Sequence, residues 1–477
     1  MTGRKPLRIA TLGLLLLLTS QWRVDAQEGG VYGHYEIYDQ DNFSLSEYAG
    51  RRQRVVEKLP SGSLMLIRSG DIRIRSNDVE YEFRQRNNLL YLSGVTETES
   101  ALLLAPDGVE IDGKKVKEVL FVAKRNPSHE TWTGIRMGPE VASDVTGIQT
   151  VVPTERLAEV LETLLPGIDK FYYDGWMIEQ VTEPFIKSPL DWPSLVAMLL
   201  EEREIEVEMI DAGDILDNLR AIKSDAEIKM LQKAIDISAA GHRAAMREAQ
   251  PGMYEYEFEA TMESTFRKLG AEDPGYPSIV GSGPNTCILH YSTNRRRSQD
   301  GDLVLMDCGA EYHGYSADIT RTFPVNGTFS PEQRAIYDLV LEAQEAGIRE
   351  CKVGVQFWDP HRKAAQVIGA GLVKLGIMKG GDNVQRYFMH GTSHFLGMDV
   401  HDVGDDFSLK PGMVLTVEPG IYIPEGSKCD PKWWNIGVRI EDDILVTKDG
   451  PVNLSASLER TAEEIERLVG SGSDKGQ

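Results

Sequence analysis

The segment GDLVLMDCGAEYHGYSADITRTF, residues 301–323, constrains the fold most, because an apolar run leads directly into a carboxylate. The run LVLM predicts a buried strand that ends at Asp307, and a buried charge is costly unless it is paired or binds a metal ion. If the chain reverses around residues 312–314, Asp307 faces Asp318 across a hairpin. Two adjacent carboxylates repel each other, and a divalent cation would neutralise them. The alternative is that Asp307 caps a strand and Asp318 serves a turn.

Further acidic residues stand at the ends of other apolar runs. Glu418 follows GMVLTV, and in GVRIEDDILV the period-two rule places Arg439 and Glu441 on one face of a strand. Together with Asp307 and Asp318, the two glutamates form an oxygen-rich set of four carboxylates. Such a set, completed by a histidine, is sufficient to hold two divalent ions bridged by carboxylates.

The stretch HGTSHFLGMDVHD, residues 390–402, supplies three histidines, His390, His394 and His401. Histidine changes readily between proton carrier and metal ligand near neutral pH, so the cluster is a candidate for catalysis or metal binding. A hydrogen-bonded structural role for each single histidine is the alternative. The zincin motif H-E-x-x-H is excluded here, because Gly391 stands where the motif requires glutamate.

The hydrophobic periodicity predicts an α+β protein of two domains. In the first region, four apolar runs are typical of strands and two segments have helical spacing, so this region is expected to be α/β. The expected strands are 63–70, 87–95, 100–108 and 118–126, and the expected helices are 46–59 and 154–165.

A change of pattern near residue 215 indicates the start of the second domain. Ser224 and Glu227 form a capping-box signature that begins a long helix ending near Ala249. A second long helix is predicted after Ser330, with proline at its first position and glutamine closing the box. Strands are expected at 302–307, 315–323, 413–418 and 437–446. The predicted domains are 40–214 and 215–468, followed by a flexible tail, 469–477.

Residues 1–26 have the parts of a secretory signal. Basic residues precede an apolar run from Ile9 to about Leu18, and Val24-Asp25-Ala26 resembles a small-residue cleavage site. The run is short for a bilayer span, so cleavage after Ala26 is favoured over a membrane anchor. We therefore expect an exported protein, periplasmic or secreted, that has no membrane attachment after cleavage.

The charge of the chain argues against a nucleic-acid partner. Acidic residues outnumber basic residues by 74 to 51 in 477 residues, which gives a formal charge of -23. Binding of phosphates requires clustered Lys and Arg in excess.

Four cysteines in so long a chain do not make a disulfide framework, and the absence of C-x-x-C in the sequence leaves a thiolate zinc site unsupported.

Several motifs resemble those of the pita-bread metallopeptidases, and within them the Xaa-Pro branch that includes aminopeptidase P and prolidase. The motifs are SIVGSGPNTCILHY, DCGAEYHGYSADITRTF, HGTSHFLGMDVHDVG, TVEPGIYI and GVRIEDDILVT, in the region from about 220 to 468. In the first domain, YEFRQRNNLLYLSGV and WTGIRMG are similar to the creatinase-type N-terminal domain of aminopeptidase P.

The resemblance implies roles for individual residues. It implies that two divalent metal ions are bound by Asp307, Asp318, His394, Glu418 and Glu441. It further implies that Glu418 is the general base and that His290 and His401 are catalytic histidines that do not bind metal. Supporting or substrate-contacting positions are implied for Tyr276, His390, Tyr422, Arg439 and Arg136.

The function implied by the resemblance is hydrolysis of the peptide bond before proline, with release of the N-terminal residue from peptides that have proline at position two. Manganese is the expected metal, because oxygen-rich sites suit it, and a homo-oligomer is expected. The alternatives are an Xaa-Pro dipeptidase (prolidase) and a non-catalytic pita-bread binding protein. Two departures from the family affect substrate contacts: Leu90 replaces one member of an aromatic pair, and Arg136 is what remains of an arginine pair.

Overall fold

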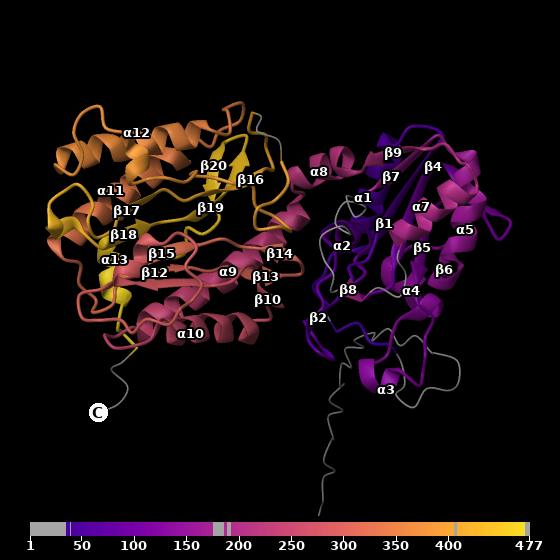
Figure 1. Ribbon diagram of the computed structural model, residues 1–477, viewed down its shortest axis with the longest axis horizontal. Coiled ribbons are helices and arrows are strands. Elements are labelled where there is room, and N and C mark those ends of the chain that lie inside the picture. Colours follow the sequence, from indigo (N-terminus) through magenta and orange to yellow (C-terminus); the bar gives the residue numbers. More distant parts are fainter. Residues whose placement is uncertain (1–34, 39, 175–185, 188–191, 405–407, 473–477) are drawn as a thin grey trace, which may run out of the picture.

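A computed structural model describes residues 35–38, 40–174, 186–187, 192–404 and 408–472 of the chain. Figure 1 shows two parts side by side, with helix α8 (Gly213–Ala221) between them. The two-domain α+β organisation predicted from the sequence is confirmed. The predicted signal segment, 1–26, lies outside the described residues.

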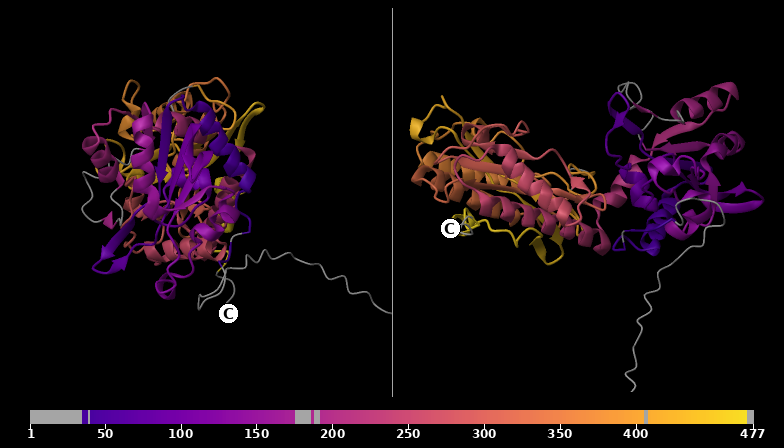
Figure 2. Two further views of the ribbon diagram at one scale, coloured as in Figure 1. Left: turned by 90° about the vertical axis from the view of Figure 1, so that its right-hand side faces the viewer. Right: turned by 90° about the horizontal axis from the view of Figure 1, so that it is seen from below.

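A six-stranded mixed sheet forms the core of the N-terminal part. Its order is β6 (Val151–Pro153), β5 (Lys114–Val122), β4 (Ala101–Ile111), β1 (Ser63–Arg68), β7 (Lys170–Tyr173) and β9 (Glu208–Asp211). Strand β1 is buried along its whole length, because Leu64 and Leu66 enter one core cluster whereas Met65 and Ile67 enter another. Helices lie on both sides of these strands (Figure 2, left). They are α1 (Leu45–Lys58), α2 (Asn87–Ser93), α3 (Glu130–Thr133), α4 (Gly138–Thr146), α5 (Leu157–Leu164) and α7 (Trp192–Glu202).

The predicted strand at 87–95 is wrong, because residues Asn87–Ser93 form helix α2. Leu89 and Leu92 are fully buried at helical spacing, and Gly94, with φ of +70°, ends the helix in the left-handed conformation. A short apolar run does not by itself distinguish a strand from a short helix. The glycine directly after the run was the signal that the periodicity argument missed.

The other elements predicted in this region are confirmed. Strands β1, β4 and β5 occupy the expected positions, as does α1, and a 3-10 turn (Thr154–Arg156) leads into α5. A smaller sheet, in the order β3 (Val79–Glu80), β2 (Ile72–Ser76) and β8 (Ile186–Lys187), completes the described part of this region.

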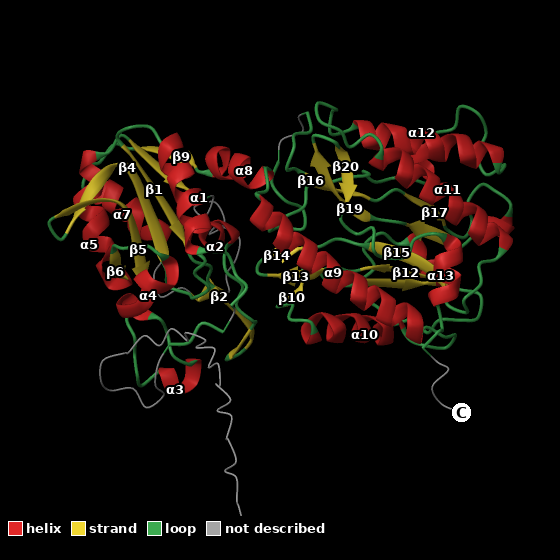
Figure 3. Ribbon diagram, turned by 180° about the vertical axis from the view of Figure 1, so that it is seen from behind, coloured by secondary structure: helices red, strands yellow, loops and turns green. Residues whose placement is uncertain are grey.

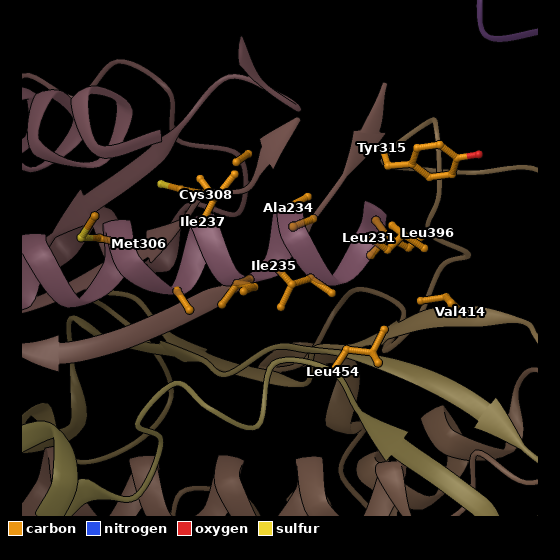
Figure 4. Close-up of a cluster of buried hydrophobic side chains, with 14 of the residues drawn as sticks. Leu231, Ala234, Ile235, Ile237, Met306, Cys308, Tyr315, Leu396, Val414 and Leu454 are labelled. Carbon is orange, nitrogen blue, oxygen red and sulfur yellow. The ribbon is translucent and has the colours of Figure 1, made fainter. Parts of the chain in front are cut away.

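The long helix α9 (Asp225–Glu248) begins with the predicted capping box. The Ser224 side chain accepts a hydrogen bond from the Glu227 N–H (3.4 Å), and the Glu227 carboxylate accepts one from the Ser224 N–H (2.9 Å). Its apolar face packs into the core of the C-terminal part, where Ile237 lies near Cys308 and Leu231 near Leu396 (Figure 4). The helix thereby supports the strands that end at the acidic residues.

The C-terminal part has its strands between two pairs of helices. Figures 1 and 3 show α9 and α10 (Glu255–Lys268) on one side and α11 (Pro331–Ile348) and α12 (Asp359–Lys374) on the other. Two sheets are β11 (Ile279–Ser282)-β12 (Leu303–Asp307)-β15 (Thr320–Pro324) and β10 (Asp273–Pro274)-β13 (Ala310–Tyr312)-β14 (Tyr315–Ser316). Two more are β16 (Val414–Val417)-β19 (Asp442–Thr447)-β20 (Gly450–Asn453) and β17 (Gly420–Ile423)-β18 (Ile436–Arg439). The capping box predicted for α11 is present, since Ser330 accepts from the Gln333 N–H (3.2 Å).

The domain boundary lies in a helix, and the last described residues are bound to α9. The predicted boundary at residue 215 falls within α8. After α13 (Ala462–Leu468), the start of the expected flexible tail is bound to the end of α9, where Gly470 and Gly472 donate to the carbonyls of Met246 (3.0 Å) and Arg247 (2.9 Å). None of the helices in the described ranges combines the length and apolarity needed to cross a membrane.

Candidate metal centre

Asp307 stands at the end of a fully buried strand. Strand β12 lies between β11 and β15, pairs antiparallel with both, and has no exposed residue. Because the preceding residues are apolar and paired on both sides, the carboxylate at the end of the strand is held in one place. The sequence argument for a buried strand leading to Asp307 is confirmed.

The hairpin after β12 has the predicted turn but a different register. His313 and Gly314 have φ values of +47° and +77°, which is the geometry of a tight two-residue turn. The predicted pairing of Asp307 with Asp318 is wrong, because this turn places Thr320 opposite Asp307. The sequence argument had placed the centre of the turn one residue too early.

Asp318 nevertheless lies beside Asp307, because the chain leaves the ladder between β14 and β15. Gly309 permits this close approach, since a Cβ there would overlap the carbonyl oxygen of Ala317. The Tyr276 hydroxyl is 2.6 Å from a carboxylate oxygen of Asp307 and 2.6 Å from one of Asp318. The two carboxylates are therefore adjacent, with Tyr276 bridging them.

His242 on α9 holds the backbone behind the two aspartates. Its Nε2 is 3.1 Å from the carbonyl oxygens of both Cys308 and Ile319, the residues that directly follow the aspartates. Burial and the nearby Arg321 lower the pKa of His242 to about 4, so the imidazole is neutral near pH 7. The sequence contained no motif that pointed to this histidine.

Glu418 and Glu441 come from a second pair of strands. In the antiparallel pairing of β16 with β19, Val417 lies opposite Asp442, so the next residues outward, Glu418 and Glu441, are neighbours. The predicted continuous strand through 437–446 is interrupted, because β18 ends at Arg439 and β19 begins at Asp442. Glu441 lies at this interruption and is buried.

Thr320 joins the two sets of strands. The Glu441 N–H donates to the Thr320 carbonyl (3.2 Å), and the Thr320 hydroxyl donates to the Glu441 carboxylate (2.6 Å). The Arg439 guanidinium donates to the same hydroxyl (3.1 Å). Thr320 was not predicted as a site residue, although its period-two spacing from Asp318 was visible in the sequence.

His394 completes the cluster of potential ligands. Its Nε2 is 3.2 Å from an Asp318 oxygen and 3.8 Å from a Glu418 oxygen, while Nδ1 lies 3.1 Å from the Phe395 carbonyl. A proton on Nδ1 donated to that carbonyl leaves Nε2 free to bind a cation. In the described chain, ligand atoms of Asp318, His394 and Glu441 lie within 4.8 Å of one another and could hold a metal ion.

Burial disfavours the negative charges of this cluster. Desolvation is the largest cause that raises the pKa of Asp318, Glu418 and Glu441, and neighbouring carboxylates raise them further; the pKa of Glu418 reaches about 8. Desolvation alone would lower the pKa of His394, but its hydrogen bond to Asp318 raises the value to about 9. Divalent cations would supply the missing positive charge, and the chemistry of four carboxylates and one imidazole fits them.

Arg439 is the fixed cation of the centre. Its guanidinium donates to an Asp307 oxygen at 2.5 Å and to the Tyr422 hydroxyl at 3.0 Å, and its side chain is only 3 % exposed. The Tyr422 hydroxyl lies 2.8 Å from His390 Nε2, and His390 Nδ1 lies 3.7 Å from Glu418. Burial and Arg439 lower the pKa of His390 to about 4. These three predicted supporting residues therefore contact the ligand set directly or through one another.

His290 lies in a loop that is organised by a buried glutamate. The loop follows the 3-10 turn Gly283–Cys287, and Arg439 donates to the Leu289 carbonyl next to His290 (3.4 Å). The Glu255 carboxylate accepts hydrogen bonds from Ser282 N–H (2.7 Å), Asn285 (3.0 Å), Tyr291 (2.9 Å) and Arg296 N–H (2.7 Å). Glu255 was not predicted from the sequence, because its partners lie far along the chain.

His401 lies next to the centre, whereas Arg136 is held elsewhere. The imidazole rings of His401 and His394 have centroids 4.4 Å apart at an angle of 67°. Burial and His394 lower the pKa of His401. The hydrogen bond that the described chain makes with the Arg136 side chain runs to Thr98 in the N-terminal part (2.9 Å). The structure thus brings every predicted site residue except Arg136 to one centre or the loops beside it.

This fold, with a buried carboxylate and histidine centre between its sheets, defines the class of pita-bread metallohydrolases. Residues 229–448 match the family model for metallopeptidase family M24, and residues 48–172 match that for the aminopeptidase P N-terminal domain. The chain belongs to metallopeptidase family M24. It is therefore a metal-dependent exopeptidase, and the resemblance seen in the sequence motifs is confirmed.

The similarity to individual relatives extends over nearly the whole chain. The chain is 40% identical to the Xaa-Pro aminopeptidase of Escherichia coli K12 over 89% of its own length and 98% of that protein. It is 38% identical to the Xaa-Pro aminopeptidase of Haemophilus influenzae, over 89% and 97%. The solved structure of Pseudomonas aeruginosa aminopeptidase PepP matches with a TM-score of 0.84 at 37% identity, covering 91% of this chain and 100% of that one.

Substitution of the acidic residues should separate metal binding from turnover. We expect Asp307→Ala and Glu441→Ala to lose both bound metal and activity, because each removes a carboxylate from the cluster. His401→Ala should retain the metal and lose turnover, because His401 lies beside the carboxylates without belonging to them. Metal content and peptide hydrolysis are measured on the same preparations.

A matched control for these variants is Asp300→Ala, which removes an exposed carboxylate that accepts from Asn326 (2.7 Å). It should leave metal content and rate unchanged. Loss of the metal from the His401 variant would contradict the assigned roles.

Proposed function

We propose that this protein hydrolyses the peptide bond before proline and releases the N-terminal residue from peptides that begin Xaa-Pro. The observation that carries the proposal is the joint match of fold and site: five potential ligands converge in a chain that is 40% identical to an Xaa-Pro aminopeptidase over nearly all of both proteins. The same name is carried by relatives of lower identity, for example Xaa-Pro aminopeptidase 3 of Homo sapiens, which is 35% identical over 90% of this chain and 87% of that protein.

The proposed metal ligands are Asp307, Asp318, His394, Glu418 and Glu441. Two divalent ions held there would polarise the scissile carbonyl and lower the pKa of a water molecule. Glu418 is the proposed proton acceptor, because a carboxylate that lies beside a metal-activated water can take its proton and pass it on. His290 and His401 are proposed to donate hydrogen bonds to the carbonyl oxygen or the leaving nitrogen.

Proline at position two explains why a dedicated hydrolase is needed. The nitrogen of the bond before proline carries no hydrogen, and the ring fixes φ, so a site that recognises an N–H at this position cannot accept the substrate. The side chains proposed here act on the carbonyl and the leaving nitrogen and require no such N–H.

A homo-oligomer is part of the proposal as well, since the resemblance implies one.

Peptide length distinguishes the proposed aminopeptidase from a dipeptidase. We expect kcat/KM for an Xaa-Pro tetrapeptide to exceed that for the Xaa-Pro dipeptide, because an aminopeptidase leaves room for the chain beyond proline. The ratio reports the difference in transition-state binding between the two substrates. If the dipeptide is cleaved at least about tenfold better, the protein is a prolidase.

Manganese is the proposed metal. An oxygen-rich ligand set favours manganese over a structural zinc ion. Protein expressed in mixed metals is analysed for its metal content, then stripped with a chelator and reactivated with single metals. We expect stripped protein to be inactive and manganese to restore the highest rate. Full activity after complete removal of metal would contradict metal-dependent hydrolysis.

Export is proposed from the composition of residues 1–26. A basic start, a short apolar run and a small-residue site are the parts of a cleaved signal. N-terminal sequencing of material from the exported fraction should find Gln27 as the first residue. An intact Met1 in a membrane fraction would indicate an anchor instead.

A further inference from the structure

The loop that carries His401 is fixed by buried charges. It lies outside the named strands, between His394 and β16. Asp402, the next residue after His401, has a side chain that is 1 % exposed. One oxygen of Asp402 lies 2.6 Å from the Arg220 guanidinium and the other lies 2.9 Å from Lys223 Nζ. Both cations are also buried, with side chains 5 % and 1 % exposed.

Arg220 also contacts the loop on the other side of His401. Its guanidinium donates to Asp399 at 2.6 Å, in addition to Asp402, so one cation binds the residues on both sides of His401. A third hydrogen bond runs to the side chain of Asn88 on α2 (3.0 Å). The same guanidinium thus connects the His401 loop, helix α8 and the N-terminal part.

The backbone is shaped to admit this arrangement. A Cβ at Gly397 would overlap the Asp402 carboxylate, so the ion pairs require glycine at that position. The Asp402 N–H donates to the Phe395 carbonyl (2.9 Å), and the Gly397 N–H donates to that of Asp399 (3.1 Å). The loop therefore folds back on the residue that follows His394, which explains how two histidines seven positions apart in sequence have adjacent rings.

The backbone of Lys223 is itself held in place by a hydrogen bond. Its N–H donates to the Gly412 carbonyl (2.9 Å), just before β16, and it directly precedes the capping box of α9. Lys223 therefore lies in the short connection between α8 and α9, and its backbone is hydrogen-bonded to the residue pair before β16. Figures 1 and 3 show α8 at the junction of the two parts of the molecule.

We propose that Arg220 and Lys223 are positioning residues for His401, acting through Asp402 and, for Arg220, also through Asp399. This proposal rests on the proposed function, in which His401 contacts the substrate. Buried ion pairs are costly to assemble and contribute little to stability. Two buried cations from outside the loop that bind its aspartates therefore indicate that the loop must keep one geometry. Loss of either cation would leave one oxygen of the buried Asp402 carboxylate without its partner, and the loop would shift and displace the His401 imidazole.

The test is a set of double-mutant cycles on the metal-loaded, full-length protein with an Xaa-Pro tetrapeptide. We expect Lys223→Met to lower kcat by about 10- to 100-fold, with KM within about threefold and metal content unchanged. In the His401→Ala background, the same substitution should lower the residual kcat by no more than about twofold, because the group being positioned is already absent. Lys223→Arg should restore most of the activity, since it keeps the charge.

A second readout does not depend on turnover. In protein labelled with 15N-histidine and loaded with diamagnetic zinc, the ring resonances of His401 are identified by their loss in His401→Ala. We expect them to shift in Lys223→Met. Asp399→Asn serves as a milder variant, because Asp399 is 47 % exposed; it should shift the same resonances and lower kcat by about 3- to 10-fold.

The matched control is Arg52→Gln. Arg52 is also a buried arginine, 2.7 Å from Glu118, but it lies in the N-terminal part and contacts no residue of the centre in the described chain. It should lower thermal stability without changing kcat or the His401 resonances.

The other possible results separate the positioning role of the two cations from the proposed role of His401 in hydrolysis. Full multiplication of the Lys223 and His401 effects, loss of metal from the folded Lys223 and Asp399 variants, or unmoved His401 resonances would overturn the positioning role. Wild-type activity in His401→Ala would instead refute the proposed role of His401 in the hydrolysis. If Lys223→Met does not fold, the Asp399 variant carries the same test.

Discussion

The accumulation of buried carboxylates is the constraint on which the rest of this structure depends. Asp307, Asp318, Glu418 and Glu441 are brought together where desolvation raises the pKa of the last three. Repulsion of this kind would destabilise any fold without compensating positive charge. Arg439 supplies one fixed cation, and the divalent ions on which family M24 relies supply the remainder. The fold must therefore be rigid enough to hold groups that repel one another.

Rigidity comes from short strands that are tied to one another and to helices. Thr320 links the strand next to Asp307 with Glu441, and His242 on α9 fixes the carbonyls that follow both aspartates. Behind Glu441, the fully buried Arg321 donates to the Glu441 carbonyl (2.7 Å) and to Asp442 (2.8 Å). Asp307, Asp318, His394 and Glu441 each have a hydrogen bond that sets the direction of the side chain, which is the general requirement of a metal site that must keep one geometry.

The loops that carry the two proposed catalytic histidines use a different device. Neither His290 nor His401 lies in a named strand, so the sheet ladders do not place them. The Glu255 carboxylate accepts hydrogen bonds from N–H and side-chain donors of the His290 loop. The Asp402 carboxylate forms ion pairs with the cations that fix the His401 loop. In both cases a buried charge organises a loop by satisfying several partners at once. The side chains of the two proposed catalytic histidines are thereby not needed to hold their own loops.

Local pattern was sufficient to single out the candidate ligands and to predict much of the fold. Apolar runs ending at Asp307 and Glu418, and the capping boxes at Ser224 and Ser330, depend on residues that are close in the sequence, so periodicity and motif spacing predicted them. Contacts between distant segments decided the rest. They set the register that pairs Asp307 with Thr320 and the bridging position of the Tyr276 hydroxyl. They also include the hydrogen bond from Arg220 to Asp399, 179 residues further along the chain. The helix at Asn87–Ser93 belongs to the same group, because burial of Leu89 and Leu92 against the sheet chose between two conformations that the short run permits. The sequence by itself therefore determined which groups are the candidates for the chemistry, whereas only the tertiary structure decided how they are held, because the energy of a buried charge depends on neighbours that local sequence does not specify.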